Sequence, residues 1–425
     1  MNIGTELHKL AEKLYPINRS LTGDGVRETL NILKKEIPGL KIKEVPTGIV
    51  CFDWSIPKEW NVQEAYIVDP DGNKICDFSK NNLHLVGYSV SVDLVMSLEE
   101  LNKHLYSLPE QPEAIPYVTS YYEENWGFCI SQNDRNSLKS GGYKVYIDSI
   151  LGHGSLSYGE LIIKGNTSEE IFFSTYVCHP SMGNNELSGP VVVTYLAKYI
   201  QSIKNRRYSY RIVFIPETIG SIMYLSKNLG IMKKNIVSGF NVSCVGDDDS
   251  YSYLPSRYGD TLSDKVAVHI LKNLVKNFKR YSYLDRGSDE RQYCSPGVDL
   301  PVCSIMRTKY GEYEQYHTSL DDLNFISDKG LEGAYKVYIE IIKALEANYL
   351  YEVFIKCEPQ MGKRGLYPTL SIKGEHNDVD TMMNFMAYAD GSNDLIEIAN
   401  IIKVPIWNLY DMVNKLLRHG LIEKV

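Results

Sequence analysis

Residues 172–189 read Phe172-Phe-Ser-Thr-Tyr-Val-Cys-His179-Pro-Ser-Met-Gly-Asn-Asn-Glu186-Leu-Ser-Gly189. The first half is rich in aromatic and β-branched residues, which is typical of a buried strand. The strand pattern stops at His179-Pro, and a turn of small and amide residues carrying Glu186 leads into a helical pattern. A histidine at the carboxyl end of a strand lies where open α/β sheets bind their ligands. Histidine and glutamate are both metal-ligand types, so the stretch predicts a metal site at a strand end.

The alternation of strand and helix continues from about residue 159 to residue 350. Apolar strand-like runs lie at 170–177, 211–216, 237–245 and 300–305. Helical patterns lie at 191–203, 219–229, 264–278 and 331–347, and two more occur in the first forty residues. Alternation at this spacing predicts an α/β fold, with a mostly parallel, mixed sheet covered by helices on both faces.

Two further segments do not follow the strand–helix alternation of this α/β core. Short alternating runs split by turn signals such as Asp69-Pro-Asp-Gly72 indicate a β-rich inserted domain over 43–146. Its aromatic residues, including Trp54 and paired Tyr121-Tyr122, are typical of a core, and a place along a substrate groove is the alternative. The last segment, 353–425, reads as helix, turn, helix and a short final run, which predicts a winged helix-turn-helix. The core would then comprise 1–42 and 147–352.

Composition and charge are those of an ordinary soluble protein. The hydrophobic share of 44% and charged share of 23% are average, and the net charge of −8 argues against a general binder of nucleic acids or anionic membranes. The N-terminus has no apolar signal core, and no apolar run approaches the roughly 18 residues of a membrane span. Eight scattered cysteines without a CxxC pair indicate free thiols. We therefore expect a cytoplasmic protein without a membrane segment.

A winged helix invites a DNA-binding interpretation, but the charge of this one opposes it. Residues 376–425 contain four Lys and Arg residues against seven Asp and Glu residues. A DNA-binding surface needs cationic side chains for the phosphates. The expected role of this domain is contact with a protein partner or homodimerisation, and nucleic acid is not expected as a partner.

Three later segments offer the other parts of a hydrolytic site. Glu217 ends an apolar strand, where a carboxylate can act as general base towards an activated water. His317 precedes the last long helix and offers a second imidazole. The polar loop before strand 300–305 carries Asp289 and Arg291. Each feature alone is also compatible with a structural role, and it is their joint occurrence at strand ends that favours a site.

The order of these motifs resembles a known family. His-Pro, Asn-Asn-Glu-Leu-Ser-Gly, Pro-Glu-Thr-x-Gly, Ser-Asp-Glu and Tyr-His-Thr look like the zinc aminopeptidase fold of the co-catalytic exopeptidases. Within that fold, the chain is most similar to the bacterial branch of polysaccharide-biosynthesis proteins with an aminopeptidase-like domain. The resemblance covers the first forty residues and 150–350, and the insert and winged helix are also typical of the branch. It implies two zinc ions held by a His, a bridging Asp, a Glu, an Asp and a final His, with a further Glu as base.

This ligand set carries over only in part. His179 and His317 match the two imidazoles, and Glu217 matches the base. The other ligand positions carry neutral side chains, namely Asn185, Thr218 and Ser243. A neutral amide cannot bridge two cations as a carboxylate does, so a complete two-metal site is not expected.

The remaining groups suit one zinc ion. His179, Glu186 and His317 would hold it and leave a fourth position open for water, which is the pattern of a catalytic zinc site. Glu217 would take the proton of that water and pass it to the leaving amine. Asp247 is a possible extra ligand, displaced from the expected position.

Five residues are candidates for substrate binding by residue type, namely Arg19, Asp289, Arg291, Tyr293 and Tyr316. An arginine can hold a substrate carboxylate through two hydrogen bonds. The aspartate can orient a ligand histidine, and a tyrosine can donate to an oxyanion.

The leading interpretation is a zinc-dependent, aminopeptidase-like hydrolase of an amide or peptide bond. Its substrate would be a small peptide or an acylated amino sugar, the sugar being implied only by the resemblance. A degenerate peptidase-fold module that binds a metabolite and acts through its winged helix is the alternative. The retained base and both histidines favour the enzyme, whereas the neutral Thr218 and Ser243 favour the module. A transcription regulator is a third possibility, which the acidic C-terminal domain disfavours.

Overall fold

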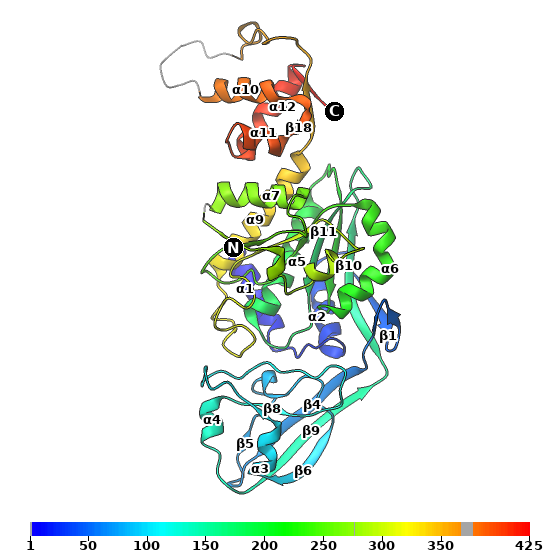
Figure 1. Cartoon of the computed structure of the whole chain (residues 1–425), viewed down its shortest axis with the longest axis vertical. Helices are drawn as coiled ribbons and strands as arrows, with labels where there is room; N and C mark the ends of the chain where they lie inside the picture. The colour runs from blue at the N-terminus through cyan, green and yellow to red at the C-terminus, as the bar shows by residue number, and fades with distance from the viewer. Residues whose placement is uncertain (1, 276, 367–376) are drawn as a thin grey trace. The chain divides into compact units, whose positions relative to one another are not determined.

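The computed structural model describes residues 2–275, 277–366 and 377–425, and the chain divides into two compact units. The first comprises residues 1–263 and 279–336, and the second comprises 264–278 and 337–425. Figure 1 labels the helices and strands of each. Within the described residues, no helix is both long and apolar enough to cross a membrane. The expected insert belongs to the first unit, so its boundaries at 43 and 146 stay a prediction.

An eight-stranded mixed sheet forms the centre of the first unit. Its strands, in spatial order, are β1 (Lys41–Pro46), β10 (Ser155–Ile163), β12 (Ser209–Ile215), β11 (Glu170–Tyr176), β13 (Ile236–Asn241), β16 (Val302–Met306), β14 (Ser252–Leu254) and β15 (Lys279–Arg280). The four central strands β12, β11, β13 and β16 are parallel, and antiparallel pairs flank them on both sides. The predicted α/β fold with a mixed sheet is confirmed.

Helices cover both faces of this sheet, as the alternation of side chains along β10 shows. Tyr158 and Glu160 contact Tyr224 of α6 (Ile219–Asn235), with 5.8 Å between the two tyrosine rings and a 2.7 Å hydrogen bond to Glu160. Gly159, which lies between them, faces Leu30 of α2 (Asp24–Glu36). Successive strand residues point to opposite faces, so α2 and α6 lie on opposite sides of the sheet. The other long helices that begin in this unit are α1 (Ile3–Leu14), α5 (Ser188–Ser202) and α9 (Asp328–Ala347).

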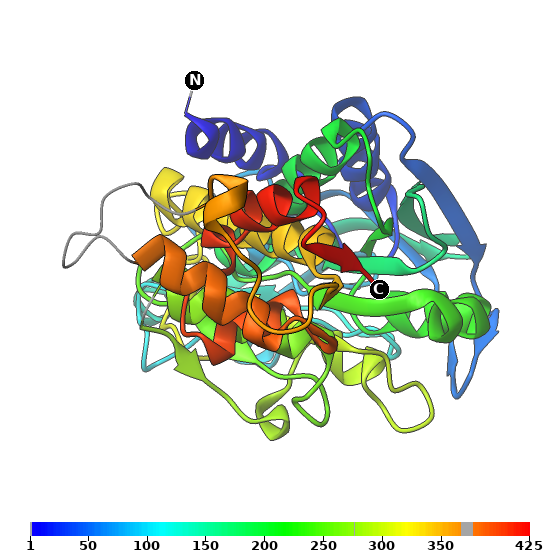
Figure 2. The same cartoon turned by 90° about the horizontal axis from the view of Figure 1, so that it is seen from above.

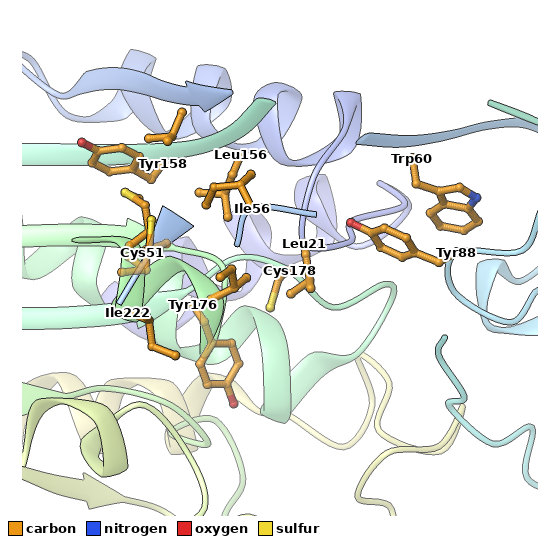
Figure 3. Packing of buried hydrophobic residues seen from close by; sticks show 14 of the residues in the cluster. Leu21, Cys51, Ile56, Trp60, Tyr88, Leu156, Tyr158, Tyr176, Cys178 and Ile222 are labelled. Atoms are coloured by element: carbon orange, nitrogen blue, oxygen red, sulfur yellow. The ribbon is translucent and has the colours of Figure 1, made fainter. Parts of the chain in front are cut away.

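The expected β-rich segment forms a second, four-stranded antiparallel sheet. In spatial order its strands are β5 (Lys74–Ile75), β4 (Glu59–Val68), β9 (Gly142–Gly152) and β6 (Val92–Ser97). The rings of Trp60 and Tyr88 stack at 5.5 Å in a hydrophobic cluster that also contains Tyr176, Cys178 and Ile222 of the α/β core (Figure 3). The segment therefore shares a hydrophobic core with the central sheet.

The second unit contains the winged helix. Its helices are α10 (Asn377–Tyr388), α11 (Leu395–Ile401) and α12 (Tyr410–Arg418). They accompany a three-stranded sheet in the order β18 (Asp390–Asp394), β17 (Leu350–Val353) and β19 (Ile422–Lys424). Figures 1 and 2 show α12 and β19, in red, next to each other at the C-terminus. Helix, helix and terminal strand confirm the fold predicted for this segment, of which residues 367–376 lie outside the described residues.

Gly189, in the first turn of α5, permits a close approach on which the site depends. A Cβ at this position would clash with the Thr175 hydroxyl and the Val242 carbonyl oxygen, at the ends of two central strands. We expect Gly189→Ala to destabilise the protein by about 1–3 kcal/mol through overpacking, seen as a lower urea midpoint.

Gly230→Ala is the matched control, because Gly230 is an exposed helical glycine with open space around its Cα. It should be neutral or stabilising by up to about 1 kcal/mol. Equal losses in the two variants would contradict the packing argument.

Candidate active site

The two strand ends that carry His179 and Glu217 lie side by side. β11 and β12 are parallel neighbours, with Tyr176 opposite Ile215. Because parallel strands end at the same edge of a sheet, the residues that follow them meet. Nε2 of His179 lies 3.8 Å from Oε2 of Glu217. The ring of His317 joins them, with its centroid 5.6 Å from that of His179. Three of the expected groups are therefore brought together.

These side chains line a cavity of about 350 Å³ in the first unit. This volume is within the range of sites for small-molecule ligands. The α/β core contributes Leu21, Cys178, His179, Glu217, Thr218, Ile219, Arg291 and His317 to the lining. The β-rich segment contributes Trp54, Tyr117, Thr119, Tyr121 and Tyr122. Aromatic residues of that segment thus do line a pocket, which was the alternative to a purely structural role.

A carboxylate fixes the orientation of His179. Oε2 of Glu186 lies 3.1 Å from Nδ1 of His179 and accepts a 3.1 Å hydrogen bond from the backbone N–H of the same residue. With Nδ1 engaged, Nε2 is the nitrogen directed at Glu217 and the cavity. Burial alone would lower the pKa of His179, but the neighbouring Cys178 and Glu186 side chains raise it well above its ordinary value. These two neighbours therefore stabilise the protonated form of the imidazole.

Glu186 is itself held by Arg19 from the N-terminal helical pair. Nε of Arg19 donates to Oε1 of Glu186 at 3.1 Å and to the His179 carbonyl oxygen at 3.0 Å. Its Nη1 donates to the Leu14 carbonyl oxygen at 2.7 Å. Arg19 and Glu186 are fully buried and do not line the cavity. Arg19 is thus bonded behind His179 rather than placed in the cavity, and Glu186, which is bonded there too, remains part of the group with Cys178 and His179 that could hold a metal ion.

His317 is a neutral imidazole at the edge of the cavity. Its ring stacks on Tyr316 at 3.9 Å and meets Tyr117 edge-on at 5.2 Å. Burial, together with the nearby His179, lowers the pKa of His317 to about 3. The residue has a left-handed backbone with φ of 57°, which is uncommon outside glycine. A neutral ring nitrogen has a lone pair available for a ligand bond.

One carboxylate oxygen of Glu217 is held in place and the other faces His179. Ser288 Oγ donates to its Oε1 at 2.7 Å, which leaves Oε2 on the side of His179. Burial raises the pKa of Glu217 above its ordinary value, and His179 and Arg291 oppose that rise. A raised carboxyl pKa brings a base closer to neutral pH, where proton transfer is most effective.

Asp289 supports the turn that follows Glu217. Thr218 has φ of 62° and ψ of −79°, an uncommon backbone for a β-branched residue. Its N–H donates to Oδ1 of Asp289 at 2.8 Å, and Ser221 Oγ donates to the same atom at 2.7 Å. Burial and the charge of Glu217 raise the pKa of Asp289 to about 7. Asp289 was expected to orient a ligand histidine, whereas these bonds attach it to the Glu217 turn.

The remaining candidates lie outside the cavity lining. The hydroxyl of Tyr293 is buried and pairs with that of Ser174 at 2.8 Å. Asp247 accepts from the Thr308 hydroxyl and backbone N–H, at 2.7 and 2.9 Å, and from Asn184 at 3.0 Å. Tyr316 stacks on His317 and is not itself among the residues that line the cavity. Of the five substrate-binding candidates, Arg291 is the one that lines the cavity.

The donor set fits one metal ion better than two. Asn185 and Ser243 occupy positions where the resemblance implies carboxylate ligands. Nδ2 of Asn185 and Oγ of Ser243 are buried without a hydrogen-bond partner among the described residues. Oδ1 of Asn185 accepts from the Tyr176 hydroxyl at 3.1 Å. Neutral groups do not offset the charge of a second cation. Cys178, His179 and Glu186 form the one compact group of metal-ligand side chains found within the described residues.

Some contacts had no signal in the sequence. Tyr117 lies against both histidines, with ring centroids at 5.4 Å from His179 and 5.2 Å from His317. Tyr176 packs against His179 at 5.2 Å. Cys178 lies 3.5 Å from Nδ1 of His179 and accepts from the Glu217 backbone N–H. Tyr176 and Cys178 stand inside the quoted stretch, but their residue types did not mark either of them as a neighbour of the histidine.

Comparisons with known proteins agree with this architecture. A family model described as a domain of unknown function, DUF4910, matches residues 8–348, and a winged helix-turn-helix model matches residues 349–424. A relative from Clostridium acetobutylicum is 45% identical over 398 residues, covering 93% of this chain and 91% of its own length. It is provisionally named a polysaccharide biosynthesis protein with an aminopeptidase-like domain.

Solved structures extend the comparison. One from Clostridium acetobutylicum, provisionally named a peptidase, has a TM-score of 0.94 and 42% identity, covering 99% of this chain and 96% of its own. A zinc aminopeptidase from Bacillus subtilis has a TM-score of 0.57 at 12% identity, covering 81% of this chain and 94% of its own. The second likeness shows a shared fold, which confirms the aminopeptidase-like architecture.

Proposed function

We propose that this chain, which belongs to the DUF4910 family and has an aminopeptidase-like fold, is a zinc-dependent hydrolase of amide bonds. One observation carries the proposal. Nε2 of His179, the neutral ring of His317 and the carboxylate of Glu217 converge on one cavity at the ends of parallel strands. A binding module has no need of a base beside two imidazoles, whereas a hydrolase needs all three.

The residues divide the work as follows. A zinc ion held by His179 and His317 would supply Lewis acidity and a lowered pKa for water. Glu217 would accept the proton of the attacking water at Oε2 and return it to the leaving nitrogen. Ser288 keeps Glu217 in place through its bond to Oε1. We assign Glu186 to the orientation of His179 rather than to direct ligation, because Arg19 and His179 already occupy its oxygens.

A small peptide or an acylated amino sugar remains the proposed substrate. The cavity volume suits a ligand of that size. The sugar is supported by the provisional name of the Clostridium acetobutylicum relative. The winged helix is of a kind that contacts protein or DNA, and its acidic charge supports a protein partner or a second copy of the chain.

Elemental analysis of zinc tests the proposal. We expect about one zinc per chain in protein prepared without a chelator or a metal-affinity tag, since His179 and His317 offer two imidazoles of the kind that bind zinc. His317→Ala should lose it, and His153→Ala, which changes an exposed histidine outside the cavity, should keep it. No zinc, even after zinc is supplied, would overturn the hydrolase. Two ions per chain would contradict the single-ion site.

The neutral side chains at Asn185, Thr218 and Ser243 favour a second candidate, a degenerate peptidase fold that binds a metabolite and acts through the winged helix. This module would retain ligand binding without turnover. It becomes the better description if the zinc-loaded protein binds amide compounds in the cavity and hydrolyses none of them.

A further inference from the structure

Arg291 is a cation of the cavity without a carboxylate partner among the described residues. It stands exposed on α8 (Glu290–Tyr293), and its Nη2 donates to the Thr218 hydroxyl at 2.7 Å. That bond uses one of the five N–H groups of a guanidinium. By contrast, the buried Arg19 and Arg211 are each paired with a glutamate. The free donors of Arg291 are therefore available to a ligand.

The guanidinium also lies beside the proposed base. Its Nη2 bonds the hydroxyl of Thr218, the residue that follows Glu217 in the chain, and all three side chains line the cavity. A group bound to Arg291 would thus lie next to the base rather than at a remote rim.

The cavity has no spare acid for a cationic ligand. Among its lining residues, all of which the structure describes, Glu217 is the only carboxylate. It already accepts from Ser288 and faces His179. The nearby acids Glu186 and Asp289 are fully buried and are not part of the cavity lining. An ammonium group placed there would lose its hydration without gaining a counter-charge, which is costly.

The rest of the lining is aromatic. Trp54 and Tyr122 meet edge-on at 6.2 Å and are both exposed, and the hydroxyls of Tyr117 and Tyr121 bond each other at 2.9 Å. Such side chains give apolar faces for the uncharged part of a ligand.

From this distribution we propose that the substrate is a carboxylate-bearing amide without a free amine at the reacting end, an N-acyl amino acid being the simplest member of the class. The carboxylate pairs with Arg291, and the apolar part lies against the tyrosines. Water adds to the amide carbonyl, the C–N bond breaks, and the nitrogen takes up the proton, giving the free acid of the acyl group and an amino acid. This rests on the proposed amide hydrolase and departs from a free-amine, aminopeptidase-type substrate.

Three matched ligands test the charge preference by calorimetry with the full-length, zinc-supplied protein. They are N-acetyl-L-phenylalanine, its uncharged amide N-acetyl-L-phenylalaninamide, and the free amine L-phenylalaninamide. We expect the acid to bind at least about tenfold more tightly than either amide, because a charge-assisted bidentate bond contributes that much. Tightest binding of L-phenylalaninamide, equal binding of all three, or binding of none at millimolar concentration would overturn the proposal.

Arg291→Gln should abolish the preference for the acid, and Arg291→Lys should retain part of it as a point charge. Arg286→Gln is the matched control, because Arg286 is exposed in the preceding loop and lies outside the cavity lining. It should bind like the parent protein. A preference that survives in Arg291→Gln would overturn the assignment.

Binding and turnover separate this inference from the function on which it rests. If the acid binds in a manner that depends on Arg291 but is not hydrolysed, the proposed hydrolase activity is wrong and the proposed carboxylate-binding site at Arg291 is supported. If L-phenylalaninamide is hydrolysed in preference to the acid, the proposed hydrolase activity is supported and the proposed carboxylate-binding site is wrong.

Discussion

Glu217→Gln should lower the rate of amide hydrolysis by about 10²–10⁴-fold, the usual contribution of a general base. Glutamine has nearly the same shape and can keep the hydrogen bond from Ser288, but it cannot take a proton from water. The loss should therefore appear in kcat, with little change in KM. The measurement is steady-state kinetics on the fastest substrate from a panel of peptides and N-acyl compounds.

Zinc content distinguishes a base from a ligand in this variant. If Glu217 acts only as base, the Gln variant keeps about one zinc per chain. Loss of the ion together with activity would show that Glu217 is a ligand, and activity within a few-fold of the parent would exclude it as base. Ser288→Ala, which removes the bond to Oε1, should give a smaller loss of kcat than Glu217→Gln.

The part of the site that follows from sheet geometry could be predicted from the sequence. An apolar run that stops at His179 and another that stops at Glu217 mark two strand ends, and parallel pairing then brings the two side chains to one edge. The position of His317 did not follow in this way. It lies in an irregular loop before α9, where no periodicity fixes distance, so only the resemblance linked it to the other two.

The direction of Glu186 could not be predicted for a different reason. Residue type marks it as a possible ligand, but its role depends on Arg19, which stands 167 residues away in sequence. The sequence around either residue gives no indication that the two side chains form an ion pair. The aromatic lining of the cavity could not be assigned to particular residues either, because Tyr117 and Tyr122 lie outside regular strands, where side-chain alternation gives no inward or outward face. Trp60, inside β4, took the core position that its pattern predicts.

Arg19→Met should have the largest effect on stability, a loss of about 3–5 kcal/mol in the free energy of unfolding. The arginine and Glu186 are both completely buried, and the arginine also satisfies carbonyl oxygens of Leu14 and His179. Methionine fills similar volume but leaves the carboxylate without its counter-charge in an environment of low polarity. The urea midpoint of unfolding, followed by tryptophan fluorescence, gives the loss.

Two further variants show whether the unpaired charge causes that loss. Adding Glu186→Gln to Arg19→Met removes the buried charge, so the double variant should be less destabilised than the sum of the two single changes. Arg27→Met is the matched control in the next helix, because its ion pairs with Asp24 and Glu59 leave its side chain 24% exposed. Pairs that keep some access to solvent contribute less than fully buried ones, so this variant should lose less stability than Arg19→Met. If Arg19→Met were no worse than Arg27→Met, the buried pair would not be the element that holds the N-terminal helices against the His179 strand end.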